Sequence, residues 1–144
     1  MKNINYTATI EVAKSTEDVF NHITDVSKWW SKEYKGSSTK LNDEFIINHP
    51  DRHYSKQKLI EVIPNKKIVW LTTESKLNWI EKDKNEWTNT KMVFDIIPKG
   101  DQTVLHFTHI GLVPEKECYQ KCEQGWNMII KERLFNFIAS DKAI

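Results

Sequence analysis

The 144-residue chain contains few cysteines and glycines and almost no excess charge. Its two cysteines, Cys118 and Cys122, are too few for the disulfide framework of a small secreted domain. Only four glycines are present, which argues against Gly-rich phosphate-binding loops. The 21 Lys and Arg residues nearly match the 20 Asp and Glu residues. The resulting net charge of +1 provides no general attraction to nucleic acid or to an anionic membrane.

Long apolar segments are also missing. No run approaches the roughly 20 residues that a membrane-spanning helix requires. The first twelve residues alternate in polarity instead of forming the continuous apolar stretch of a secretory signal. We therefore expect a cytoplasmic protein without membrane insertion, folded as one domain over residues 1–144. One residue type is abundant: the chain has six tryptophans. A surplus of this large side chain often marks a cavity wall or an interface.

Alternating polarity predicts most of the secondary structure. Residues 4–12 alternate strictly, as expected for a half-buried strand. Ser15 and Asp18 then resemble a capping box before a short helix, and Asp25 could cap a second short helix that ends at Trp29 and Trp30. Gly36 and the three residues after it indicate a loop. Further strands are predicted at 45–49, 53–63, 67–74, 87–97 and 103–110.

The end of the chain reads as one long helix from Pro114 to about Ile138. Its apolar residues recur at spacings of three and four, so a wide apolar stripe needs a large surface to cover it. The predicted fold is therefore α+β, with a curved six-stranded antiparallel sheet wrapped around the C-terminal helix in the order β-α-α-β5-α, the helix-grip arrangement. The charged stretch 75–86 is compatible with either an extended hairpin arm or a mobile flap.

Several segments carry a family resemblance. Residues 11–23 with Trp29-Trp30 resemble the opening of the START-like superfamily related to the birch-pollen allergen. The segment from Thr103 to Leu112, with the pattern T-x-L-x-F-T-H-x-G-L, is followed by Gly125-Trp126 and Leu134. This combination resembles the branch named for activators of the ATPase of heat-shock protein 90, and small stand-alone bacterial members are similar from end to end.

The resemblance implies a fold more than a chemistry. The superfamily includes lipid carriers, plant hormone receptors, polyketide aromatase/cyclases and co-chaperone domains, which use one cavity architecture for different purposes. The eukaryotic co-chaperones carry a separate N-terminal chaperone-binding domain, for which we expect no room in this chain.

The candidate ligand-binding residues are aromatic side chains on the inward faces, a Trp in the charged stretch and one inward histidine. They are Trp30, Phe45, Trp70, Trp79, Phe94, Phe107, His109 and Trp126. Apolar pockets with a few polar groups are typical of small-molecule sites. The alternative is that these side chains fill the interior completely. His109 is either a polar contact for a ligand or a structural histidine bonded within the core.

No catalytic residue, metal site or cofactor is assigned from the sequence. His49 and His53 flank a Pro-Asp-Arg turn without the spacing of a familiar zinc site. Cys118 and Cys122 lie one helical turn apart, where core packing is favoured over a redox or metal role.

Three functions remain open. The first is binding of a small apolar or aromatic molecule, with Trp79 and Leu77 as a lid. The second is a cyclase or dehydratase that uses His109 to shuttle protons. The third is a co-chaperone-like interaction module, which exposure of Trp29, Trp79 or Trp87 would favour. The sheet edge also allows a homodimer without requiring one.

Overall fold

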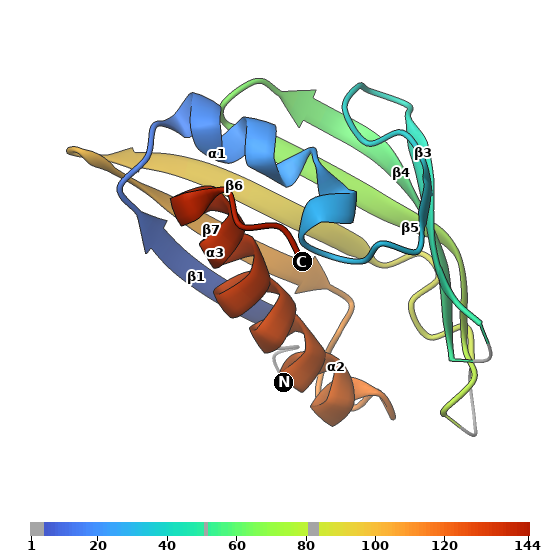
Figure 1. Ribbon diagram of the computed structural model, residues 1–144. Helices are drawn as coiled ribbons and strands as arrows, with labels where there is room; N and C mark the ends of the chain where they lie inside the picture. Colours follow the sequence, from blue (N-terminus) through green and yellow to red (C-terminus); the bar gives the residue numbers. More distant parts are fainter. Residues whose placement is uncertain (1–4, 51, 81–83) are drawn as a thin grey trace.

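The computed structural model describes residues 5–50, 52–80 and 84–144. Its elements are β1 (Tyr6–Val12), α1 (Thr16–Ile23), η1 (Val26–Lys28), β2 (Tyr34–Gly36), β3 (Glu44–His49), β4 (His53–Ile63), β5 (Lys67–Leu77), β6 (Lys91–Lys99), β7 (Gln102–Ile110), α2 (Tyr119–Trp126), η2 (Asn127–Leu134) and α3 (Phe135–Ser140). Figure 1 shows α1 and the C-terminal helix on one face of a curved sheet. The α+β architecture is the predicted one.

The sheet is antiparallel, with the strand order β1-β7-β6-β5-β4-β3-β2. It has seven strands among the described residues, not the six predicted. The additional strand, β2, is three residues long and pairs with β3 in the segment predicted as a loop. Gly36 ends it at φ 112°, where a Cβ would lie 2.3 Å from the carbonyl oxygen of Glu44. Glycine is usually a loop signal in a sequence, but here it allows two backbones to approach closely. The short strand therefore could not be predicted from the sequence pattern.

Curvature arises where β4 meets β5. Their register shifts twice, between Lys56 and Gln57 and between Leu59 and Glu61. Extra residues of this kind bend a strand and increase its twist. The bent sheet encloses one continuous core, in which the predicted inward residues Phe94, Leu105 and Phe107 are fully buried.

The C-terminal helix begins later than predicted. Residues 113–118 form turns, and α2 begins at Tyr119, not at Pro114. The carboxylate of Glu86 accepts the backbone N–H groups of Glu117 and Cys118 at 3.0 and 3.1 Å. This contact from the β5–β6 connection satisfies donors that a helix start would otherwise leave unpaired.

The middle of this helix, η2, is π-helical over eight residues. Fully or nearly buried side chains recur every four residues along the helix, at Cys118, Cys122, Trp126, Ile130, Leu134 and Ile138. In a regular α-helix, a four-residue repeat rotates by about 40° at each step and would turn the stripe away from the sheet. The wider π-helical turns rotate it back, so all six side chains remain against the core. No helix among the described residues is long and apolar enough to cross a membrane.

Candidate functional site

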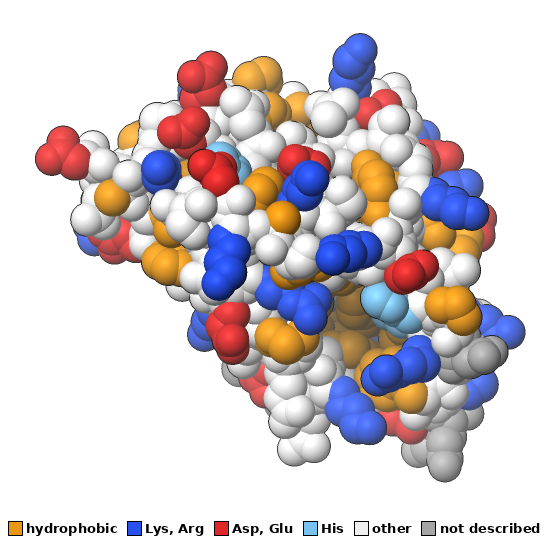
Figure 2. Space-filling model, viewed as in Figure 1, with side chains coloured by type: hydrophobic (Ala, Val, Ile, Leu, Met, Phe, Trp, Pro, Cys, Tyr) orange, Lys and Arg blue, Asp and Glu red, His pale blue; other side chains and the backbone are white. Residues whose placement is uncertain are grey.

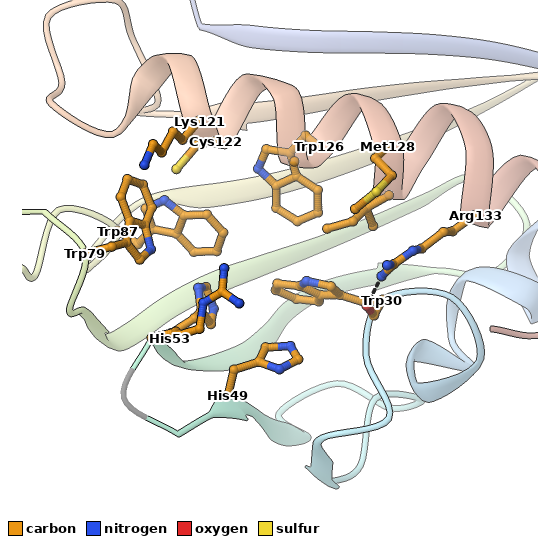
Figure 3. Close-up of a pocket in the computed structure, with 13 residues that line it drawn as sticks. Trp30, His49, His53, Trp79, Trp87, Lys121, Cys122, Trp126, Met128 and Arg133 are labelled. Carbon is orange, nitrogen blue, oxygen red and sulfur yellow. Dashed lines mark hydrogen bonds between the residues drawn. The ribbon is translucent and has the colours of Figure 1, made fainter.

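A cavity of about 380 Å³ opens between the C-terminal helix and the end of the sheet where β4 begins and β5 ends. Figure 3 shows helix side chains on one side and histidines from β3 and β4 on the other. The residues that line it are Trp30, His49, Arg52, His53, Trp79, Trp87, Lys121, Cys122, Gly125, Trp126, Met128, Ile129 and Arg133. A space of this size suits a small organic molecule.

Tryptophan rings form the inner wall. Trp126 stacks on Trp87 with ring centroids 5.7 Å apart and lies 5.2 Å from Trp30. Behind Trp30, the ring of Trp70 stacks at 5.8 Å and closes the wall toward the core. Trp87 is only 6% exposed, and its indole N–H has no hydrogen-bond partner among the described residues. The wall is therefore apolar but includes one unsatisfied donor.

His109 lies behind this wall and is held by two hydrogen bonds. The indole N–H of Trp126 donates to Nδ1 of His109 at 3.0 Å. On the other side, Nε2 lies 2.8 Å from Oγ1 of Thr90, whose hydroxyl donates to the Trp87 carbonyl oxygen at 2.6 Å. Because Trp126 can only donate, His109 must be neutral with its proton on Nε2. Burial lowers the pKa of His109 to about 3, in agreement with this arrangement.

Two further histidines form the opposite wall. His53 packs edge-on against Trp87 at 4.9 Å, and its Nε2 lies 2.8 Å from the hydroxyl of Ser55. Burial, with a smaller contribution from His49, lowers the pKa of His53 to about 4, so it is neutral near pH 7. The exposed His49 bonds through Nε2 to the hydroxyl of Ser31 at 3.0 Å.

The mouth of the cavity combines aromatic and cationic side chains. Nζ of Lys121 lies 5.6 Å from the ring centre of Trp79, a cation–π distance. The guanidinium of Arg133 donates to the carbonyl oxygen of Trp30 at 3.2 Å and so ties the helix to the loop before β2. Figure 2 shows a hollow with orange walls here, edged mainly by blue side chains and a histidine.

The cysteines lie at the start of the helix. Cys118 is fully buried, whereas Cys122 lines the cavity. A hydrogen bond with Cys122, burial and the nearby Glu86 carboxylate raise the pKa of the Cys118 thiol. Cys118 is thus not a ready thiolate. Among the described residues, no three His, Cys, Asp or Glu side chains lie close enough together to hold a metal ion.

The eight sequence-predicted site residues fall into two groups. Trp30, Trp79 and Trp126 line the cavity. The others are buried in the core behind it: Phe45, Trp70, Phe94, Phe107 and His109. They support the wall instead of facing the open space. Of the tryptophans whose exposure would favour an interaction surface, Trp29 and Trp87 are buried and only Trp79, 36% exposed, meets solvent.

Sequence reasoning missed the cationic side of the cavity. The sequence predicts an exposed turn around Arg52, and neither Lys121 nor Arg133 is among the predicted site residues. Gly125 also went unnoticed as a lining residue. An isolated glycine within a helical pattern is a usable signal. Glycine lowers helix stability, so its presence there indicates a packing or functional role.

Solved structures with the same fold share little sequence with this chain. The Aha1 dimer from Colwellia psychrerythraea, determined in solution, has a TM-score of 0.75 and 19% identity, with 97% of this chain and 99% of that chain covered. A conserved protein of unknown function from Enterococcus faecalis has a TM-score of 0.68 and 17% identity over 96% of this chain and 72% of its own. CalU16 from Micromonospora echinospora has a TM-score of 0.68 and 15% identity, covering 94% and 74%.

At these identities, structural likeness shows the fold alone. No curated protein matches the chain. The profile of the family described as "Activator of Hsp90 ATPase homolog 1-like protein" matches residues 13–138, which is most of the sequence. The predicted resemblance to this branch is confirmed, and the chain belongs to the Activator of Hsp90 ATPase homolog 1-like family.

Proposed function

We propose that this protein binds a small, mostly apolar or aromatic molecule in the cavity between the C-terminal helix and the β4–β5 end of the sheet. The lining supports this proposal, because four tryptophans, Met128 and Ile129 surround about 380 Å³ of space. Small-molecule sites are concave and mainly apolar, with a few polar groups that fix orientation.

Gly125 is the single observation that carries the proposal furthest. It lies in α2, where glycine costs about 1 kcal/mol relative to alanine. Packing does not require it, since a Cβ built at this position meets no atom within 4 Å. Its neighbours one turn away, Lys121, Cys122, Met128 and Ile129, all line the cavity. A side chain at 125 would therefore extend into the cavity, and the glycine keeps that space open.

The deep histidine does not supply an evident catalytic group. Both ring nitrogens of His109 are engaged by protein atoms, and the indole bonded to it, Trp126, lines the cavity whereas His109 does not. Proton transfer to a ligand would require that this hydrogen-bonded chain be broken. Binding without turnover is the function that this geometry supports best.

Native mass spectrometry of the purified protein, followed by a thermal-shift screen against apolar and aromatic metabolites, tests the proposal. A ligand at 100 times its Kd should stabilise the fold by about 2.7 kcal/mol. We expect a retained mass or a shift in the wild type and in Gly125→Ala, but not in Gly125→Phe. If no compound binds the wild type, or if Gly125→Phe binds equally well, the proposal is wrong.

A further inference from the structure

The charge around the cavity is one-sided although the whole chain is nearly neutral. Among the described residues, three cationic side chains line it, from three separate segments: Arg52 before β4, Lys121 in α2 and Arg133 in η2. Within residues 5–50, 52–80 and 84–144, no Asp or Glu side chain is among those that line it. The full sequence has 21 basic and 20 acidic residues, so the charge of the described cavity lining is more positive than that of the chain as a whole.

These cations are not neutralised by the described part of the chain. The ion pairs there involve Asp141, Glu44, Glu61 and Glu11, and none includes Arg52, Lys121 or Arg133. The hydrogen bond of Arg133 to the Trp30 carbonyl uses one donor of five and leaves its charge uncompensated. Lys121 lies over the Trp79 ring, which fixes its position without cancelling its charge.

We infer that the ligand is an organic anion, with an aromatic body against the tryptophan wall and a carboxylate or sulfonate at the cationic mouth. The inference rests on the proposed function and names the chemical class of ligand for the same site. Arginine and lysine at a partly enclosed apolar site form strong charge-assisted hydrogen bonds to an acid group. A neutral aromatic molecule would use the wall and leave the mouth unpaired, whereas a cation would be repelled.

The arrangement gives each part of such a ligand a partner. Figure 3 shows Lys121 and Arg133 on the same helix, on either side of Trp126. Met128 and Ile129 lie between them in sequence and add apolar surface. The acid group of a ligand can thus meet a cation at either end of the mouth, while the aromatic ring of the ligand stays against the tryptophan wall.

Calorimetric titration with three matched probes tests the inference: 2-naphthoate, 2-naphthamide and 2-naphthylmethylammonium. We expect the carboxylate to bind at least tenfold more tightly than the amide, with a preference that shrinks as NaCl is added. Arg52→Gln and Lys121→Gln should each reduce this preference severalfold. Lys131→Gln, an exposed position on the same helix outside the cavity, is the matched control and should preserve it.

The outcomes separate the inference from the proposed function. Equal binding of carboxylate and amide, or tighter binding of the ammonium probe, would overturn the anion and leave the cavity intact. A carboxylate preference that survives both substitutions would also overturn it. If none of the probes binds and the metabolite screen is also empty, the proposed function fails with it.

Discussion

Trp126 Nε1 donates a hydrogen bond to Nδ1 of the fully buried His109 across 3.0 Å, from the C-terminal helix to strand β7. The contact fixes the orientation of a cavity-lining indole from behind. It continues through Thr90 to the Trp87 carbonyl, so two wall residues share one buried chain of hydrogen bonds.

Replacing Trp126 by Phe should therefore destabilise the fold more than replacing Trp87 by Phe. Trp126→Phe leaves the buried Nδ1 of His109 without a donor, which costs about 1–3 kcal/mol. Trp87→Phe removes a similar volume but deletes an indole N–H that has no described partner. Urea unfolding of both variants checks the difference, and equal free energies of unfolding would refute the role assigned to the hydrogen bond.

Stability should fall as the solution is acidified. The pKa of His109 is lowered to about 3 and that of His53 to about 4, against about 6.5 in the unfolded chain. Between these values the unfolded chain binds protons that the folded chain does not. The stabilisation is complete above about pH 6.5 and is lost at up to about 1.4 kcal/mol per pH unit for each histidine below it.

Denaturant titrations from pH 7.5 to pH 5 measure this dependence. His109→Gln should be less stable at pH 7.5 and should show a shallower slope, because one of the two titrating groups is gone. A wild-type stability that is constant or rises on acidification would contradict the neutral, buried state of both side chains.

Gly125→Ala should stabilise the protein by about 0.5–1 kcal/mol, since alanine is the better helix former and its Cβ meets open space. The Gly125→Phe variant should also fold, but its side chain should fill the cavity. Thermal unfolding without ligand checks the first effect. A destabilised alanine variant would show that packing, not the cavity, requires the glycine.

Cys122 should react with iodoacetamide faster than Cys118 in the folded protein. Cys122 lines the cavity, whereas Cys118 is fully buried and its thiol pKa is raised by the Cys122 hydrogen bond, by burial and by Glu86. A bound ligand should slow the modification of Cys122. Mass spectrometry of alkylated peptides measures both rates, and preferential labelling of Cys118 would contradict the arrangement.

The fold was predictable because local patterns determine it. Alternation placed Leu105, Phe107 and His109 on the inward face of β7, and all three are buried there. The N-cap at Ser15 is also confirmed, with the backbone N–H of Asp18 donating to its hydroxyl at 3.0 Å. Each signal lies within a few residues of the structure it specifies.

The site was less predictable because it is assembled from distant segments. Trp87 was predicted in a strand, but it lies in turns before β6, which begins at Lys91, and so reaches the cavity wall. Arg52 and Lys121 have the sequence context of solvated charges. They meet at one opening because the curved sheet and the C-terminal helix pack together, and the register shifts of the β4–β5 pair have no signal in the local pattern.

The six indole N–H signals in a ¹H–¹⁵N NMR spectrum report directly which tryptophan side chains face a bound ligand. On titration with the best-binding compound, we predict the largest shifts for Trp30, Trp79, Trp87 and Trp126, which line the cavity. The signal of Trp29, bonded to the Ile23 carbonyl at 3.2 Å, should move least. Shifts centred on Trp29 and Trp70, or no shift at saturating ligand, would contradict binding in this cavity.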